Sequence, residues 1–112
     1  MTEPKDLPYS IAGRELLAET EGLRVQILTL AAGECIPWHY HSEVADTFVC
    51  LEGPMQVITR NPDTAHELKP GETYRIEKRK AHKVVGKDGG PCRFVIVQGV
   101  GRHDFLTIEG AE

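Results

Sequence analysis

Apolar and polar residues alternate along short stretches of this chain, and clusters of turn residues separate those stretches. From Leu23 to Ile27 every second residue is apolar, as a half-buried strand requires, and Leu28 and Leu30 then follow in the shifted phase. This shift indicates either a β-bulge or a strand that is covered on both faces. No window of a dozen residues keeps a clean 3.6-residue apolar period, so the pattern favours strands over helices.

Eight further strands are predicted by the same alternation, each bounded by glycine, proline, asparagine or aspartate. Their expected ranges are 35–41, 46–51, 55–59, 66–68, 73–76, 82–85, 92–98 and 105–108. The segment 11–20 has Leu16 and Leu17 among Glu and Ala, but Gly13 and its short length leave helix and strand equally open. Many short strands with regular turns predict an all-β barrel or sandwich.

The length and composition describe one folded domain. A chain of 112 residues has room for a single core, so residues 1–112 are expected to form one domain. Apolar residues make up 40% and charged residues 27%, which is typical of a globular protein and not of a disordered one. The formal net charge of −4 argues against a nucleic-acid partner, which would need a clustered excess of bases.

Membrane insertion and secretion are not expected. The longest apolar runs, such as 48–51 and 94–97, are four residues long, whereas a helix that crosses a bilayer needs about twenty. The first residues have neither the basic start nor the apolar core of a secretory signal, so a cytoplasmic location is expected. Cys35, Cys50 and Cys92 are an odd number without CxxC spacing, which predicts free thiols.

Three histidines and one aspartate stand where they can converge on a metal ion. His39 and His41 are two residues apart, and on a strand this spacing points both side chains to the same face. Asp46 follows after four residues, enough to turn the chain and begin the adjacent strand. His82 opens a later strand of the same predicted barrel. Imidazole and carboxylate ligands suit one divalent transition metal, and the set does not distinguish Fe, Mn, Ni, Cu or Zn.

The residues that follow Asp46 are expected to form the floor of this site. Phe48 and Cys50 share the face of Asp46 by period two, so they are candidate residues of a substrate pocket, with a buried apolar side chain as the alternative role of Cys50. An unpaired carboxylate above an apolar wall is costly unless a cation compensates it. The bases of 78–80 and Lys83 could attract an anionic substrate or form a solvated loop.

At these positions the sequence resembles the cupin superfamily. The first motif of that family runs glycine, five residues, His-x-His, three or four residues, an acid, six residues and glycine. The matching positions here are Gly33, His39, His41, Asp46 and Gly53. The second motif, a Pro-x-Gly-like turn, an extended stretch and a histidine, is similar to the segment from Pro70 to His82. The two motifs cover about 33–53 and 70–86.

Two departures from the family pattern concern the site. The usual acid of the first motif is glutamate, and Asp46 is one methylene shorter, which makes Glu43 the alternative ligand. In the second motif the family often has proline, glycine and a late asparagine, where this chain has Glu77, Arg79 and Gly86, so the shape of the loop before His82 is open.

The resemblance implies a single small antiparallel barrel of the double-stranded β-helix (jelly-roll) type with one metal ion bound by His39, His41, Asp46 and His82. It leaves three functions open, all acting on a small organic molecule: a dioxygenase-type oxidoreductase, which we favour, a redox-neutral isomerase or lyase, and a non-catalytic binding module. His66 and His103 match no motif position. Trp38 and Tyr40 are expected to face outward, and small cupins commonly form dimers, so a homodimer is predicted.

Overall fold

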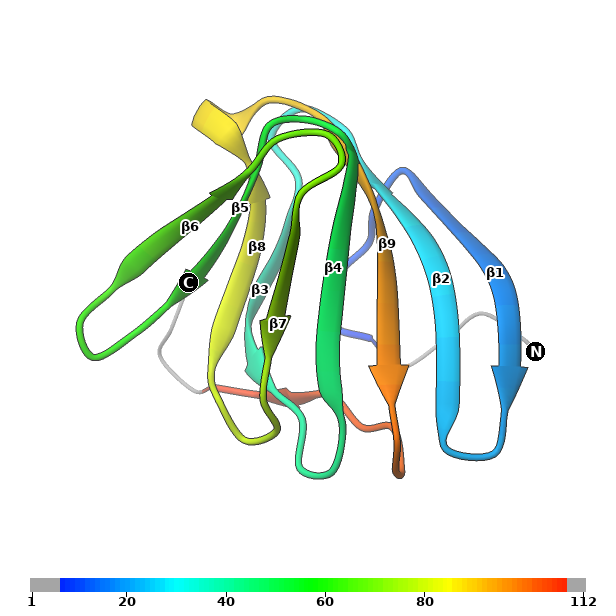
Figure 1. The fold of residues 1–112 in the computed structure, drawn as a ribbon. Helices are drawn as coiled ribbons and strands as arrows, with labels where there is room; N and C mark the ends of the chain where they lie inside the picture. Colours follow the sequence, from blue (N-terminus) through cyan, green and yellow to red (C-terminus); the bar gives the residue numbers. More distant parts are fainter. Residues whose placement is uncertain (1–6, 109–112) are drawn as a thin grey trace.

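The computed structural model describes residues 7–108, which form two five-stranded antiparallel sheets facing each other (Figure 1). The elements in chain order are β1 (Gly13–Thr20), β2 (Leu23–Leu30), β3 (Cys35–Tyr40), β4 (Ala45–Glu52), β5 (Met55–Thr59), β6 (Thr64–Leu68), β7 (Thr73–Ile76), β8 (His82–Gly86), the 3-10 turn η1 (Lys87–Gly89), β9 (Cys92–Gly99) and β10 (Leu106–Thr107). The eight strand ranges expected after residue 30 are confirmed to within two residues at either end.

The strand order is β1-β2-β9-β4-β7 in one sheet and β10-β3-β8-β5-β6 in the other. Successive strands alternate between the sheets through much of the chain, which confirms the predicted all-β double-stranded β-helix. One detail of the expectation needs correction, because the sheets do not close into a hydrogen-bonded barrel. Within residues 7–108 the outer strands β1, β7, β10 and β6 each pair on one side only, so the interior is enclosed by two stacked sheets.

The segment that the sequence left open is a strand. β1 pairs with β2 in antiparallel register, and the register shifts between Leu16 and Ala18. β2 itself pairs with β9 without a shift, so the change of phase in its sequence is not a bulge. Gln26, Leu28 and Leu30 form its buried face, and the residues between them are half-buried. β2 is therefore a strand covered on both faces, the second of the two structures that the sequence allowed.

A bulge in β3 decides which side chains face inward. Ile36 pairs with Val84 and His39 pairs with His82, so β3 uses three residues where β8 uses two. The extra residue reverses the inward phase of the strand. Ile36 therefore packs in the core while His39 also points to the interior, although their spacing is odd.

The motif glycines have separate structural reasons. Gly33 and Gly71 have φ angles of +84° and +89°, in the left-handed region that other residues rarely adopt. Gly53 is required by close approach, because a Cβ there would lie 2.8 Å from the backbone nitrogen of Met55 and 2.9 Å from Cys50 Sγ. The turns at both ends of the first motif and at the start of the second therefore depend on these glycines.

The apolar core fills the space between the sheets. The rings of Phe48 and Phe94 meet with their centroids 5.7 Å apart, and both side chains are fully buried. Met55, Val57 and Val84 reach the same core from the second sheet. Each such side chain contributes about 1.5–3 kcal/mol by leaving water.

The structure also bears on the membrane expectation. No helix within residues 7–108 is long and apolar enough to cross a membrane.

Truncating the core should destabilise the fold far more than truncating its surface. We expect Phe94→Ala to lower the free energy of unfolding by about 3–5 kcal/mol, because a buried ring is replaced by a cavity. Leu17→Ala on the 48% exposed side chain of β1 should change it by less than about 0.5 kcal/mol. Urea unfolding followed by circular dichroism measures both, and equal losses would contradict the described core.

The homodimer stays a prediction, but the surface expected to form its interface is different from the one that the sequence indicated. Trp38 is only 7% exposed because the guanidinium of Arg60 covers its ring at 4.1 Å, so Trp38 is a weaker anchor than the sequence indicated. The edge strand β1 instead exposes Leu16 and Leu17. Light scattering at tens of micromolar should give the mass of a dimer. A monomeric mass would exclude it.

Candidate metal centre

The four predicted ligands lie together at one end of the two sheets. His39 is on β3, His41 follows that strand directly, Asp46 is on β4 and His82 begins β8. One ligand atom from each lies within 4.8 Å of every other, and each residue is at most 4% exposed. Ligands on opposite sides of an ion with bonds of about 2.1 Å are about 4 Å apart, so a small contraction would suffice for coordination.

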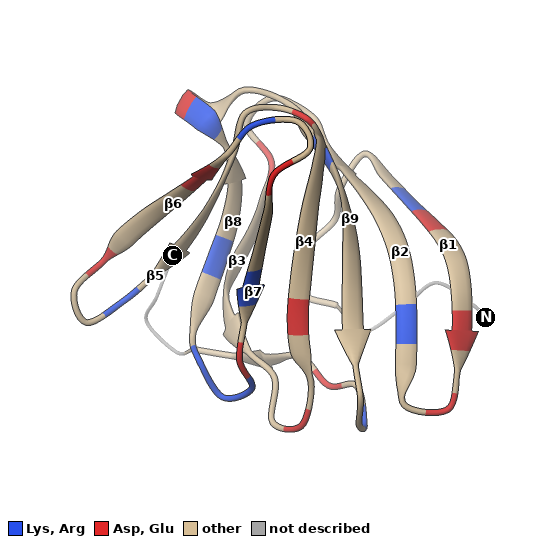
Figure 2. Cartoon of the chain, viewed as in Figure 1, with Lys and Arg blue, Asp and Glu red and all other residues tan. Residues whose placement is uncertain are grey.

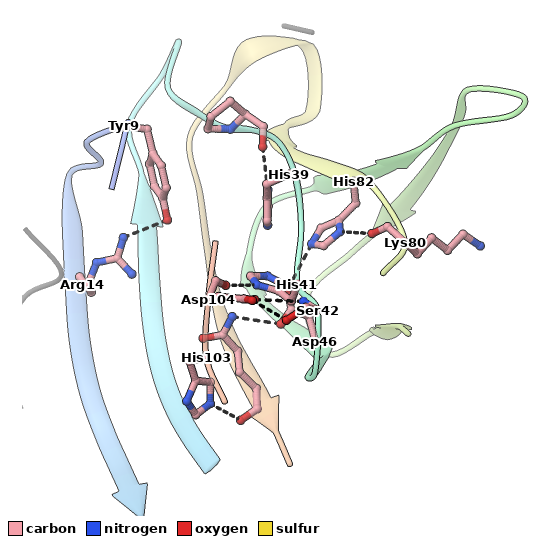
Figure 3. A network of polar contacts seen from close by, with 12 residues as sticks. Tyr9, Arg14, His39, His41, Ser42, Asp46, Lys80, His82, His103 and Asp104 are labelled. Atoms are coloured by element: carbon pink, nitrogen blue, oxygen red, sulfur yellow. Dashed lines mark hydrogen bonds and ion pairs between the residues drawn. The ribbon is translucent and has the colours of Figure 1, made fainter. Parts of the chain in front are cut away.

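Backbone carbonyls fix the orientation of all three imidazoles (Figure 3). His39 Nδ1 donates to the carbonyl of Pro37 at 2.7 Å, His82 Nδ1 donates to that of Lys80 at 2.9 Å, and His41 Nδ1 donates to that of Asp104. A carbonyl oxygen can only accept, so each Nδ1 carries a proton. In a neutral imidazole this leaves the lone pair on Nε2, as in histidines that bind metals.

The carboxylate of Asp46 lies among these nitrogens. Its Oδ2 accepts a hydrogen bond from His82 Nε2 at 3.1 Å and lies 3.0 Å from His41 Nε2, and its Oδ1 accepts a hydrogen bond from Gln98 Nε2 at 3.0 Å. The contact with His41 lacks hydrogen-bond geometry, so His41 Nε2 is a buried nitrogen without a hydrogen-bond partner. The Nε2 lone pair of a neutral His41 repels the adjacent carboxylate unless a cation lies between them, and the donor set therefore fits a metal ion.

The surroundings set the protonation of the four groups. Burial, followed by the neighbouring His82 and His41, lowers the pKa of His39 well below its usual value. Burial also opposes the charged form of His41, but the nearby Asp46 outweighs it, and the pKa is raised. The pKa of Asp46 is held below its usual value, because His41 and His82 outweigh the effect of its burial. At neutral pH, His39 is neutral and Asp46 is ionised.

Asp46, and not Glu43, is the acid of the cluster. Glu43 Oε1 accepts a hydrogen bond from the backbone nitrogen of Arg102 at 3.0 Å, and Glu43 Oε2 lies 3.4 Å from the Arg102 guanidinium. These contacts hold Glu43 at the surface. β4 is not the neighbour of β3 in a sheet, as the sequence indicated, but belongs to the facing sheet, and the shorter side chain of Asp46 reaches the histidines from there.

A segment that the sequence did not single out closes this end of the sheets. The residues between β9 and β10 cross the lower end of the fold in Figure 1. Asp104 accepts hydrogen bonds from the backbone nitrogen and the hydroxyl of Ser42, which secures the carbonyl that holds His41. Phe105 stacks on the ring of His39 with their centroids 4.2 Å apart. Nothing in the local sequence around 104 marks these contacts.

A cavity of about 400 Å³ opens beside the centre and is lined by His39, His41 and Asp46 but not by His82. Phe48 lines it, as predicted, together with the apolar Leu28, Ile96 and Phe105. Cys50 shares the inward face of β4 but does not line the cavity, because it stands one inward position deeper in the strand, within the closed core. Burial raises the pKa of its thiol, which keeps it protonated.

The remaining polar candidates are placed differently from the expectation. The loop 78–80 lies at the same end of the sheets (Figure 2), but neither its bases nor Lys83 line the cavity. Arg14, Arg24 and Gln26 from β1 and β2 do so instead. His66 contacts Thr59 and Tyr74 away from the centre. His103 lines the cavity, and its Nε2 donates to the carbonyl of Gln98 at 3.0 Å.

The proteins that are similar to this chain include two cupin-fold structures and a curated relative. L-ectoine synthase from Hyphomonas neptunium is 28% identical over 76 residues, which are 68% of this chain and 56% of that protein. The chain thus spans little more than half the length of this curated relative. A protein with a double-stranded β-helix domain from Klebsiella pneumoniae has a TM-score of 0.74 at 22% identity, over 96% of this chain and 90% of the other. An oxalate oxidase has a TM-score of 0.68 at 17% identity, over 78% of this chain and 46% of the other.

Sequence comparison with protein families gives the same result as the fold. The family described as "Cupin domain" matches residues 26–98, a segment that includes both sequence motifs and all four residues of the centre. The two facing antiparallel sheets are shared with the solved structures. The chain therefore belongs to the cupin family.

Proposed function

We propose that this protein is a mononuclear metal-dependent enzyme that acts on a small organic molecule, and that it is an oxidoreductase of the dioxygenase type. The observation that carries the proposal is the direction of the three imidazoles. Their Nδ1 protons are bound to backbone carbonyls, and their Nε2 atoms face one buried carboxylate beside a cavity. A polar cluster of this kind inside an apolar fold is costly without a cation.

His39, His41, His82 and Asp46 would hold the ion. When bound, a divalent transition metal supplies Lewis acidity and, if it is redox-active, electrons for chemistry with dioxygen. Three neutral imidazoles and one carboxylate would leave a divalent centre with a net positive charge. The cavity lined by His39, His41 and Asp46 gives a small molecule access to the centre.

The other residues of the site orient the ligands and exclude water. Gln98 donates to Asp46 Oδ1 and so directs Oδ2 toward the histidines. Asp104 fixes the ring of His41 through its carbonyl. Phe48 and Phe105 form apolar walls beside the centre, and Phe105 covers the ring of His39. A dry, oriented site strengthens every electrostatic interaction with a bound substrate.

The similar proteins support two reaction classes. The likeness in fold to an oxalate oxidase agrees with oxidative chemistry. The sequence match to L-ectoine synthase favours the second candidate, a redox-neutral isomerase or lyase in which the metal acts as a Lewis acid. Dependence on dioxygen separates the two classes.

Removing one imidazole should remove the metal. We expect His39→Ala, His41→Ala and His82→Ala each to lower metal affinity at least about tenfold, because each deletes a nitrogen ligand. His66→Ala is the control, since His66 is bound to Thr59 and Tyr74 outside the centre. Elemental analysis after dialysis measures the bound ion. Stoichiometric metal in a double His39/His41 variant would disprove the assignment.

Dioxygen uptake should reveal the reaction class. Protein reconstituted with Fe(II) should consume dioxygen in an oxygen electrode when offered enolisable diketones, thiols or phenolic acids, and His82→Ala should abolish the uptake. Product formation without dioxygen uptake, followed by NMR under anaerobic conditions, would favour the redox-neutral class. If neither occurs with any metal, the enzyme proposal fails in favour of a binding module.

A further inference from the structure

His103 is a nitrogen base of the cavity wall that the metal centre does not use. It lies in the segment between β9 and β10, is half-buried and lines the cavity, and it is not one of the four clustered residues. Enols, thiols and phenols give up a proton when their oxygen or sulfur becomes an anionic ligand. Both reaction classes proposed above therefore need a group that takes a proton from the substrate.

The main chain selects which nitrogen of His103 is free. Its Nε2 donates a hydrogen bond to the carbonyl oxygen of Gln98 at 3.0 Å, and a carbonyl oxygen only accepts. In a neutral imidazole, Nδ1 then holds the lone pair. This is the opposite tautomer to that of the three histidines of the centre, whose Nδ1 atoms carry the proton. The cavity thus contains an imidazole that is set up differently from the metal ligands.

The lone pair of His103 is accessible. In the described part of the chain, the buried side-chain nitrogens and oxygens that lack a hydrogen-bond partner are Gln26 Nε2 and His41 Nε2. His103 Nδ1 has no partner among residues 7–108 either, yet it is not one of these buried atoms. It is therefore an exposed acceptor on a residue of the cavity wall.

The register of the sheet holds His103 close to the proposed metal ligands. Gln98, whose carbonyl binds the His103 ring, is opposite Asp46 in the pair of β9 and β4, and its amide donates to Asp46 Oδ1 at 3.0 Å. The residue after His103 is Asp104, whose carbonyl binds His41. Neighbouring strands are about 4.8 Å apart, so a molecule of a few bonds can extend from Asp46 to His103.

The other polar groups of the cavity wall are weaker candidates for this role. The arginines carry donors only, and the hydroxyl of Tyr9 accepts a hydrogen bond from one of them. Burial raises the pKa of the Asp104 carboxyl, but hydrogen bonds from Ser42 outweigh burial and hold the pKa below its usual value. Asp46 belongs to the proposed centre. His103 is the remaining base with an open lone pair.

We propose that His103 is the general base of the proposed enzyme and takes a proton from the substrate at Nδ1. The O–H or S–H bond of the substrate breaks, its electron pair stays on the oxygen or sulfur, and an N–H bond forms at Nδ1. Nε2 keeps its own proton on the Gln98 carbonyl. The substrate is then a small enol, thiol or phenol. This assignment rests on the proposed function and adds a catalytic residue outside the four ligands.

A count of released protons tests the assignment without turnover. Protein loaded with Zn(II), which has no redox chemistry, is titrated calorimetrically at pH 7.5 with maltol, a small enol that chelates metals as its anion. Repeating the titration in buffers of different ionisation enthalpy gives the number of protons released per bound maltol. The wild type should release less than about half a proton, because His103 keeps the proton that maltol loses.

His103→Gln removes the base and keeps the anchor. The amide N–H of glutamine can replace Nε2–H on the Gln98 carbonyl, but no base remains at the position of Nδ1. This variant should release at least about half a proton more than the wild type. If it does not fold, His103→Leu should show the same increase. Elemental analysis should find the same amount of metal in the variant and the wild type.

His66→Gln is the matched control, because it makes the same substitution in a histidine that is bound to Thr59 and Tyr74 and does not line the cavity. It should release the wild-type number of protons. An equal increase in this variant would overturn the role of His103.

The remaining outcomes separate the two proposals. A wild type that holds no metal, or that holds metal but does not bind maltol, overturns the proposed function and this assignment with it. Equal proton counts in the wild type and His103→Gln, with metal and maltol bound in both, overturn the role of His103 alone. Loss of metal from His103→Gln would place His103 in the metal centre and also overturn its role as the base.

Discussion

The binding of three Nδ1 protons by main-chain carbonyls is the constraint on which the rest of the site depends. The carbonyls belong to Pro37, Lys80 and Asp104, which lie in three separate parts of the chain. Because the main chain selects the tautomer, no side chain has to be placed behind the histidines. The bulge of β3, the loop before β8 and the segment after β9 each have to adopt one conformation for the three nitrogens to converge.

Much of this arrangement could be predicted from the sequence, because strand alternation and residue spacing are local signals. The His-x-His pair, the acid on the next strand and the later histidine needed only the period of a strand. The carbonyl partners could not be predicted, since every residue has a carbonyl and tertiary structure decides which one is near. Gln26 was missed for a related reason. In the sequence it alternates with the apolar Val25 and Ile27, but in the structure it lies on the buried face that includes Leu28 and Leu30.

The shift of phase within β3 shows a limit of alternation as a guide. Strict period two would have placed Pro37 with His39 on the interior face, whereas the bulge brings Ile36 there. Cys50 shows the opposite case, in which the predicted face was right. Its depth along the strand placed it in the core rather than at the cavity. The alternation of apolar and polar residues predicts which face of the sheet a side chain occupies. Whether that side chain lines the cavity also depends on its position along the strand.

The segment that carries Asp104 and Phe105 has a consequence for the order of synthesis. The ligands His39, His41, Asp46 and His82 all precede it, yet His41 is oriented by a carbonyl near the end of the described chain. Chains emerge from the ribosome with their N-terminal residues first, and domains fold as units. A nascent chain that ends before Asp104 contains all four proposed metal ligands but lacks the carbonyl that orients His41. The complete donor geometry is therefore acquired only once Asp104 has been synthesised, after all four residues of the centre.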